Sequence, residues 1–428
     1  RSKLSKKDLA ILGGDAVINS NFQKYNPIGT EELNAAKDVI KTGVLSQFVG
    51  AHDQDFYGGP KVKEFEKMCC DYFNVDHAVT VNSWTSGLIA AVGALDIEPG
   101  DEIIVPTWTM CASATAILHW NAIPVFADIE EETFNIDPKS VLKNISSRTK
   151  AIMSVDIFGH SADMSELRKI ANEYGLKIIS DTAQAPGSYN NGQYSSTFAD
   201  IGGFSLNYHK HIHTGEGGIL ITNNSKLAKR MQLIRNHAEA AAEGMGEEDI
   251  SNLIGYNFRL GEIECAIGIE QLKKLDKFVQ SRQRAAERLT NGLMELKGLR
   301  TPIIKTGCTH VYYVYPIILD LGELKVTRKK IAEALRAEGV DGLMEGYANV
   351  HMLPMYQKKI AYGSNGFPWN SDFCSREIEY HKGICPIAEK LHEESFLGYE
   401  MCLHELSDND VDLILEAFHK VWKNLNKL

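Results

Sequence analysis

Short apolar runs alternate with amphipathic segments between residues 77 and 222. The runs are rich in valine, isoleucine and other apolar residues and are bounded by polar residues or glycine, which predicts strands. The segments between them carry apolar residues at three- and four-residue spacing, which predicts helices. Strands are expected at 77–81, 102–106, 123–128, 150–155, 176–181, 201–206 and 218–222, and helices at 85–95, 109–118, 139–144 and 165–174.

Two places in the pattern indicate how elements begin and connect. A helix is expected from Thr30, which is a good N-cap residue and is followed by an apolar face of Leu33, Ala36, Val39 and Ile40. The helix at 165–174 has Asp163 before it and Glu166 three residues later, a capping pattern. The glycine-rich stretch from 43 to 60 is long for a connection, which suits either a substrate lid or a plain surface loop.

This alternation predicts an α/β protein with a mostly parallel central sheet flanked by helices on both faces. After residue 262 the pattern changes to a long helix at 262–296, a strand at 311–317 and helices at 328–338 and 408–425, which indicates a smaller α+β C-terminal domain. We expect an irregular N-terminal segment at 1–30, a large domain at 31–275 and a small domain at 276–428.

Composition narrows the class of protein. The 428 residues are 44% hydrophobic, enough for a large core, and the net charge of -11 comes without a basic stripe, which argues against nucleic acid as a partner. No apolar run is long enough for a bilayer span, and the start at Arg1 lacks the apolar stretch of a secretion signal. We therefore expect a cytoplasmic protein without a membrane partner. The eight cysteines form no Cys-x-x-Cys pair, which favours reduced core thiols.

The segment between the strands at 201–206 and 218–222 holds one lysine, Lys210, among histidines. It is expected on a turn at a strand end. Burial and nearby positive charge lower the pKa of a lysine, and a neutral amine forms Schiff bases with carbonyl compounds, pyridoxal phosphate included. Lys210 is therefore the candidate nucleophile, although its spacing from the glycines also fits a surface lysine beside a turn.

Other polar residues follow the predicted strands, where ligands of parallel sheets bind. Asp181 could pair with a pyridine nitrogen, or simply cap the next turn. Gln184 could reach the hydroxyl of the same ring. The start of the helix near Thr85 offers free amides and hydroxyls for a phosphate, as would Ser205, although hydroxyls at helix starts are more often caps.

Taken in order, five motifs resemble the DegT/DnrJ/EryC1/StrS aminotransferases, which are fold-type-I pyridoxal phosphate enzymes that make amino sugars and aminocyclitols. The resemblance covers the chain from about Pro27 to its end. The motifs are Val105-Pro106-Thr107-Trp108-Thr109, Asp181-Thr182-Ala183-Gln184, Phe204-Ser205 with Lys210 and Thr214-Gly215-Glu216-Gly217-Gly218, Gly255-Tyr256-Asn257-Phe258-Arg259 and Cys385-Pro386-Ile387-Ala388-Glu389.

The resemblance implies a role for each matching residue. Lys210 matches the lysine that binds pyridoxal 5'-phosphate and moves the proton, and Asp181 matches the partner of the pyridine nitrogen. Gln184 matches the ring-hydroxyl contact, and Ser205 and Thr85 match the phosphate contacts. Asn257 matches the asparagine that reaches the phosphate of the neighbouring subunit, which implies a homodimer with shared active sites.

Two of the candidate cofactor-binding residues differ from those common in the family. Trp84 stands where glycine is common, and Met110 where an aromatic ring commonly stacks on the cofactor, a role that Trp108 could take over. Family members with histidine in place of the lysine are sugar dehydratases, and histidines flank Lys210. Counting back from Gly215 favours lysine and so transamination.

The expected activity is amino transfer from glutamate or glutamine to a keto-sugar, which we expect to be nucleotide-linked, in the synthesis of amino sugars, cell-surface polysaccharides or secondary metabolites. A keto-cyclitol is the alternative acceptor. Tyr208, His209 and His351 are candidates for substrate contact. Two other classes remain open: a metalloprotein built on His209, His211 and His213, and a noncatalytic regulator that keeps the cofactor.

Overall fold

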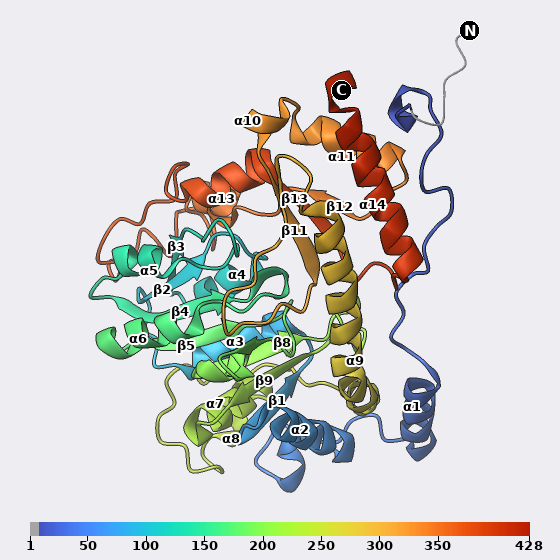
Figure 1. Cartoon of the computed structure of the whole chain (residues 1–428). Helices are drawn as coiled ribbons and strands as arrows, with labels where there is room; N and C mark the ends of the chain where they lie inside the picture. Colours follow the sequence, from blue (N-terminus) through green and yellow to red (C-terminus); the bar gives the residue numbers. More distant parts are fainter. Residues whose placement is uncertain (1–7) are drawn as a thin grey trace.

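The computed structural model describes residues 8–428, which contain three sheets, and one long helix joins the two larger ones (Figure 1). The larger sheet has seven strands and the smaller one four. Helix α9, Glu262–Leu293, runs beside both sheets and crosses residue 276, where we placed the domain boundary. That boundary stays a prediction. Residues 1–7 of the expected N-terminal segment lie outside the described residues.

The seven-stranded sheet has the order β1-β9-β8-β5-β4-β2-β3. The pairs from β8 to β3 are parallel, and β9 is antiparallel to both of its neighbours. The predicted mostly parallel sheet is therefore confirmed. Its strands are β1 His77–Val81, β2 Glu102–Pro106, β3 Ile123–Ala127, β4 Thr149–Val155, β5 Lys177–Asp181, β8 Ile201–Ser205 and β9 Gly218–Thr222, and a separate hairpin is formed by β6 Tyr189–Asn190 and β7 Gln193–Tyr194.

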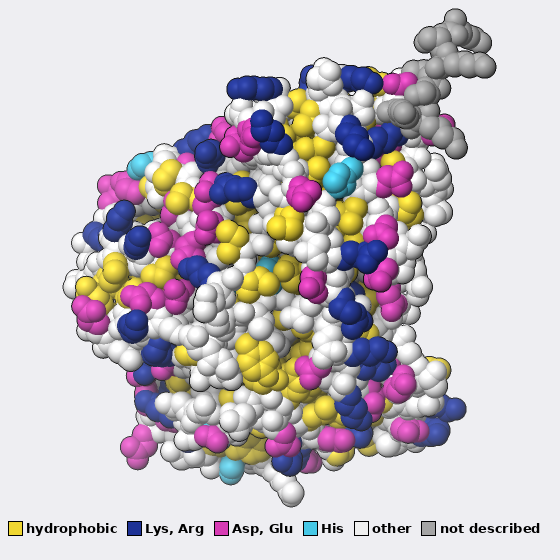
Figure 2. All heavy atoms as spheres, in the orientation of Figure 1, with side chains coloured by type: hydrophobic (Ala, Val, Ile, Leu, Met, Phe, Trp, Pro, Cys, Tyr) yellow, Lys and Arg dark blue, Asp and Glu magenta, His cyan; other side chains and the backbone are white. Residues whose placement is uncertain are grey.

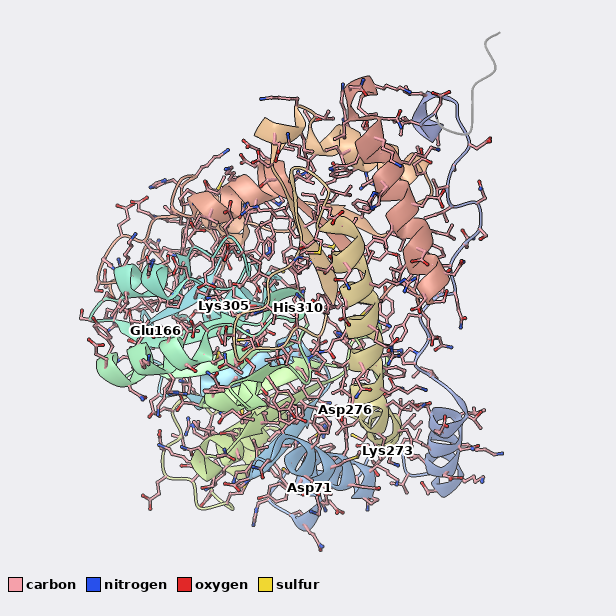
Figure 3. The ribbon with its side chains drawn as sticks, viewed as in Figure 1. Asp71, Glu166, Lys273, Asp276, Lys305 and His310 are labelled. Atoms are coloured by element: carbon pink, nitrogen blue, oxygen red, sulfur yellow. The ribbon has the colours of Figure 1, made fainter. Side chains whose placement is uncertain are left out.

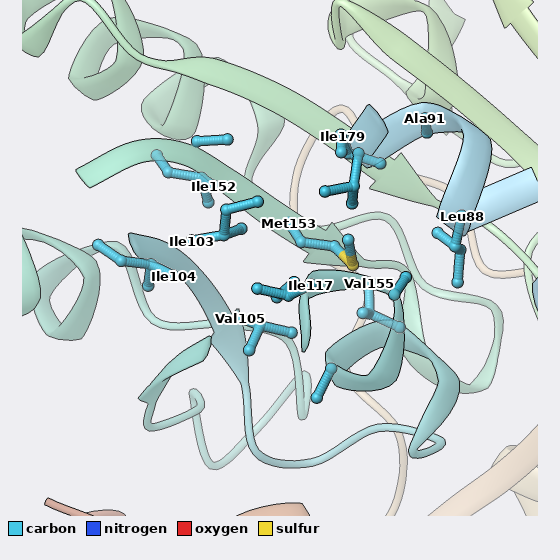
Figure 4. Packing of buried hydrophobic residues seen from close by; sticks show 14 of the residues in the cluster. Leu88, Ala91, Ile103, Ile104, Val105, Ile117, Ile152, Met153, Val155 and Ile179 are labelled. Atoms are coloured by element: carbon cyan, nitrogen blue, oxygen red, sulfur yellow. The ribbon is translucent and has the colours of Figure 1, made fainter. Parts of the chain in front are cut away.

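Helices cover both faces of this sheet (Figure 1). Ile103, Ile152 and Ile179 from neighbouring strands pack with Leu88 and Ile117 from the helices in the core (Figure 4). The helices of this part are α2 Pro60–Phe73, α3 Trp84–Ala94, α4 Ala112–His119, α5 Pro138–Asn144, α6 Met164–Tyr174, α7 Ser225–Arg235 and α8 Ala238–Ala241. The side chain of Asp163 accepts from the amide of Glu166, as the capping pattern predicts.

The smaller sheet is antiparallel, in the order β10-β11-β13-β12. Helices of the C-terminal part and the end of α9 pack against it in a second core. Its strands are β10 Leu299–Arg300, β11 Val314–Leu319, β12 Leu343–Glu345 and β13 Phe396–Glu400, and its helices are α10 Leu321–Leu324, α11 Arg328–Ala337, α12 Pro354–Gln357, α13 Pro386–Lys390 and α14 Asp408–Lys423.

The segment before β11 returns to the large sheet. Lys305 and His310 lie along it (Figure 3), and the amides of Val311 and Tyr313 donate to the carbonyls of Gly159 and Phe158. The strand predicted from residue 311 therefore begins at 314, because residues 311–313 bond to the loop after β4 instead of to the small sheet.

Residues between α12 and α13 form a strap over the outer edge of the large sheet. The Tyr380 hydroxyl donates to the carbonyl of Pro124 in the edge strand β3, at 2.6 Å. The Arg376 guanidinium pairs with both carboxylate oxygens of Glu102 in β2. The small part of the chain is therefore bonded to the large sheet well away from α9.

Helix α1, Thr30–Thr42, differs from its prediction in two ways. Its N-cap is Gly29 rather than Thr30, with the Gly29 amide donating to Glu32. The helix packs on α9 through Glu32 and Val39, and Glu32 pairs with Lys274 there, so Leu33 and Ile40 of the predicted apolar face are 66% and 58% exposed. Of the predicted apolar face, Val39 is the member that is buried within this chain.

Four further elements differ from the sequence pattern. The helix expected from residue 109 begins at Ala112, and the turn before it carries Met110. Helices α2 and α7 and strand β13 had not been predicted.

Charged side chains of both signs are scattered over the face seen in Figure 2. None of the helices in residues 8–428 is long and apolar enough to cross a membrane.

Candidate active site

A cavity of about 310 Å³ opens beyond the carboxyl ends of β4, β5 and β8, beside the start of α3. It lies where the ligands of parallel sheets bind. Most of the candidate site residues from the sequence analysis line this cavity: Trp84, Thr85, Met110, Asp181, Gln184, Ser205, His209 and Lys210. Residues of the smaller sheet and the segments beside it, Tyr313, Met344, Tyr347 and Glu400, complete the wall.

Lys210 is the amine of this cavity. It lies in the turn after β8, where its amide donates to the carbonyl of Asn207, and only 8% of the residue is exposed. Its Nζ is 4.4 Å from the centre of the Tyr313 ring. Burial lowers the pKa of Lys210 to about 8, against the opposing effect of the Asp181 carboxylate. Roughly a tenth of the amine is therefore neutral and nucleophilic at pH 7.

Asp181, the last residue of β5, is held by three donors. Trp84 Nε1 donates to Oδ1 at 2.7 Å, Ser113 Oγ donates to Oδ2 at 2.9 Å, and the amide of Ala183 donates to Oδ1 at 3.1 Å. Burial raises the pKa of Asp181, while these hydrogen bonds and Lys210 act to lower it by favouring the carboxylate. The aspartate is thus kept in a fixed orientation beside the cavity.

Gln184 is also fixed at both ends. Its Oε1 accepts from the amide of Phe158 at 2.8 Å, and its Nε2 donates to the hydroxyl of Tyr347 at 3.0 Å. Burial raises the pKa of Tyr347 to about 12, so its hydroxyl stays protonated and available as a donor. Sequence reasoning missed Tyr313 and Tyr347, because neither stands beside one of the motifs.

The start of α3 forms the other end of the cavity. The Ser83 side chain caps the amide of Ser86, and the amides of Trp84 and Thr85 have no acceptor in their own helix. Ser205 lies beside them and accepts from the amide of Asn207 through its hydroxyl oxygen, at 3.1 Å. Free amides and hydroxyl groups at the start of an eleven-residue helix suit an anion such as phosphate.

Three selected residues do not line this cavity. Tyr208 is 67% exposed. It lines an adjoining cleft together with Cys402 and Leu403. His209 and Tyr313 line both this cleft and the main cavity. Asn257 is exposed, and its side-chain oxygen accepts from Arg259 Nε at 2.8 Å. Its backbone carbonyl accepts from the side chain of Asn82, so it lies near the start of α3 but on the outside.

His351 is the third, and it is fully buried. Its Nδ1 lies 2.6 Å from the hydroxyl of Thr107 in the loop after β2, and its Nε2 lies 2.8 Å from Oε1 of Glu389 in α13. Burial lowers the pKa of His351. With both ring nitrogens bonded inside the protein, His351 joins α13 to the large sheet and has no nitrogen left for a substrate.

The histidines near Lys210 have separate partners. His211 Nε2 bonds to the carbonyl of Val311 at 2.7 Å, and His213 Nδ1 accepts from the amide of Gly215 at 3.1 Å. Within residues 8–428, no group of three or more histidine, cysteine, aspartate or glutamate side chains is arranged to hold a metal ion. The geometry gives the metalloprotein interpretation no support.

A buried lysine and a buried aspartate facing one cavity at the carboxyl edge of such a sheet are the arrangement expected of a fold-type-I aminotransferase. Residues 40–395 match the DegT/DnrJ/EryC1/StrS aminotransferase family. The chain belongs to this family, and it is an aminotransferase.

Two curated relatives show the range of the family. The chain is 34% identical to the GDP-perosamine synthase of Vibrio cholerae, over 76% of this chain and 87% of that one. It is 32% identical to the L-glutamine:2-deoxy-scyllo-inosose aminotransferase of Streptoalloteichus tenebrarius, over 93% of this chain and 96% of that one. The names indicate a nucleotide-linked sugar for the first relative and a cyclitol for the second.

A solved structure gives the same fold. The structure of S. venezuelae DesV in complex with a ketimine intermediate superposes with a TM-score of 0.77 and 26% identity, covering 94% of this chain and 99% of that chain. The predicted fold class is confirmed.

Proposed function

We propose that this chain uses pyridoxal 5'-phosphate to move an amino group from glutamate or glutamine to a keto-sugar carried on a nucleotide. The observation that carries the proposal is the pairing, across one cavity, of an amine whose pKa is lowered to about 8 with a buried carboxylate held by three donors. When bound there, pyridoxal phosphate supplies an aldehyde for the amine and a ring that takes up electrons.

The residues of the cavity fit this cofactor. The Asp181 carboxylate suits a protonated pyridine nitrogen, and Gln184 with Tyr347 suits the ring hydroxyl. The free amides of Trp84 and Thr85, with Ser205, suit the phosphate. Met110 lies in the same cavity and is the candidate for packing on the ring face.

The chain's own groups account for the proton transfer. Lys210 Nζ is neutral in a useful fraction at neutral pH, so once displaced by an amino donor it can accept a proton from the donor carbon. The protonated amine can return that proton at the neighbouring position, because the Tyr313 ring beneath it tolerates the cation. Tyr313 and Tyr347 form part of the cavity wall beside this amine.

Two alternative functions are compared with this proposal. A dehydratase would differ from it in the residue at position 210, and an aminotransferase of cyclitols would differ from it in the acceptor. A family dehydratase would carry histidine at this position. Lys210 lines the cavity while His211 bonds to the carbonyl of Val311, which supports amino transfer over dehydration. A keto-cyclitol is the second candidate acceptor, since the chain is similar over 93% of its length to a 2-deoxy-scyllo-inosose aminotransferase. Location in the cytoplasm stays a prediction from the sequence.

We also propose that the enzyme is a homodimer in which Asn257 completes the partner's site. Large apolar side chains of α1 and the loop after it are exposed on the single chain: Leu33, Ile40, Val44, Leu45 and Val49. Such a patch is typical of an interface. Asn257 is exposed and does not line its own cavity, which suits a role in another subunit's site.

The test of the function is to trap the cofactor. Purified protein loaded with pyridoxal phosphate and reduced with borohydride should carry the pyridoxyl group on the peptide that contains Lys210. Lys210→Ala should remain unlabelled and lose at least about 1,000-fold in amino transfer, since the amine is both nucleophile and proton carrier. Labelling of Lys210→Ala to the wild-type extent would overturn the assignment.

The acceptor is identified by screening keto-sugar nucleotides and keto-cyclitols with glutamate and with glutamine, scored by the mass of the product. Amination of a nucleotide-linked keto-sugar supports the proposal. Amination of cyclitols alone replaces it with the second candidate. Cofactor binding without turnover of any pair would indicate the noncatalytic regulator.

A further inference from the structure

The indole of Trp84 occupies a slot between α3 and the large sheet that two glycines leave open. A Cβ atom at Gly203 would lie 2.5 Å from two atoms of the indole, and one at Gly87 would lie 2.8 Å from it. Both distances are too short for a side chain. Trp84 itself is 5% exposed, so the ring is a buried part of the cavity floor rather than a surface group.

The slot aims the indole N–H at Asp181. Strands β5 and β8 are paired so that Asp181 lies opposite Gly203, and the ring resting over Gly203 places Nε1 2.7 Å from Oδ1 of the aspartate. Tryptophan has one N–H and no acceptor, so this contact uses its full hydrogen-bonding capacity. Ser113 holds the other oxygen from α4.

We propose that Trp84 is a positioning residue, which holds the Asp181 carboxylate ionised and in one orientation so that its remaining lone pairs serve the pyridine nitrogen. The inference rests on the proposed function. It assigns the indole of Trp84 a role through Asp181, while the backbone amide of the same residue stays a candidate contact for the phosphate. It also explains how this chain carries tryptophan where glycine is common in its family: Gly87 and Gly203 make the room.

The groups around Asp181 decide whether its pKa rises or falls when the N–H of Trp84 is removed. Lys210, Asp156 and Tyr347 are the titratable groups that interact with Asp181. Burial raises the pKa of Asp181, and the N–H of Trp84 is one of the donors that lower it. Loss of that donor therefore raises the pKa, so the carboxylate becomes protonated at a higher pH and releases the ring nitrogen earlier on acidification.

The experiment compares Trp84→Phe with Trp120→Phe. Trp120 is a matched control, because it is 6% exposed in the same core and its Nε1 donates to the carbonyl of Ile89 at 2.7 Å, away from the cavity. Each protein is titrated with pyridoxal phosphate, and the absorbance of the bound cofactor is followed against pH. Thermal unfolding of each cofactor-free protein is recorded alongside.

Trp84→Phe should bind the cofactor about tenfold more weakly, and the low-pH transition of its absorbance should move up by about one pH unit. Trp120→Phe should match wild type within about twofold in both measurements while losing similar thermal stability. Equal cofactor affinity and an unmoved transition in Trp84→Phe would overturn the proposal.

Trp84→Gly is the second variant, in case phenylalanine does not pack in the slot. If neither Trp84 variant folds while Trp120→Phe does, Trp84 is required for folding and the positioning role is overturned. Wild-type protein that fails to bind pyridoxal phosphate would instead overturn the proposed function. The two failures are thus distinguishable.

Discussion

At the scale of single residues, burial sets the chemistry of the cavity. Lys210 and Asp181 are both almost fully enclosed, and enclosure shifts the two pKa values toward the neutral forms. For the lysine this shift makes a nucleophile. For the aspartate it opposes function, and the donors from Trp84, Ser113 and Ala183 counter it.

The lowered pKa of Lys210 predicts the pH dependence of cofactor loading. The neutral amine is the reactive form, and its fraction rises as the pH passes through about 8 and then levels off. The rate at which cofactor-free enzyme takes up pyridoxal phosphate should follow this curve. Absorbance stopped-flow between about pH 6 and about pH 10 measures it. A rate still climbing at about pH 10, where an exposed lysine titrates, would contradict the prediction.

The sequence could locate the site residues that follow strands of the large sheet. It could not locate the site residues that come from segments beside the small sheet. Lys210, Asp181 and Gln184 follow strands of one parallel sheet, so the topology alone places them together. Tyr313 and Tyr347 come from segments next to the small sheet, and only the packing of that sheet on the large one brings them to the cavity. No local signal could have selected them.

At the scale of elements, continuous apolar strands and amphipathic helices such as α6 were predictable, and helix α7 was not. Helix α7 contains Arg230 and Arg235, which give it the composition of a solvated segment, yet both are buried. Arg235 pairs with Glu66 and bonds to Thr80, contacts distant in sequence that no local pattern contains. Strand β13 contains Gly398, a residue type that is rare in strands, so its sequence pattern is weak.

The link between α13 and the loop after β2 can be tested at His351. His351→Ala removes two buried hydrogen bonds, to Thr107 and Glu389, and should lower the free energy of unfolding by about 2–3 kcal/mol in urea titrations. The KM for the keto substrate should stay within about twofold, because the imidazole does not reach the cavity.

His419→Ala is the control, since His419 makes one hydrogen bond, to the carbonyl of Gly292 at 2.7 Å. It should cost about 1 kcal/mol. Unchanged stability of His351→Ala with a KM raised about tenfold or more would instead restore the substrate contact expected from the sequence.

At the scale of the whole molecule, the single chain exposes apolar side chains of α1, among them Leu33 and Ile40, and it also exposes Asn257. These residues belong to different elements, and the proposed homodimer would account for the exposure of both.

Mixing two inactive variants tests the shared site. Lys210→Ala and Asn257→Ala should each be impaired as homodimers. In a mixed dimer, one site carries both changes and the other carries neither, so refolding an equal mixture should restore about a quarter of wild-type activity. Light scattering with Leu33→Glu should show a shift toward monomer. No recovery in the mixture, with dimers of normal mass, would mean that Asn257 serves its own subunit.

The strap between α12 and α13 has a consequence for aggregation. Strand β3 ends the large sheet, and an end strand offers unsatisfied amides and carbonyls that can recruit a strand from another molecule. Tyr380 and Arg376 fasten the strap along that end, through Pro124 and Glu102. A chain shortened between residues 361 and 380 would keep its catalytic groups but lose the shield over β3, and would polymerise from this edge.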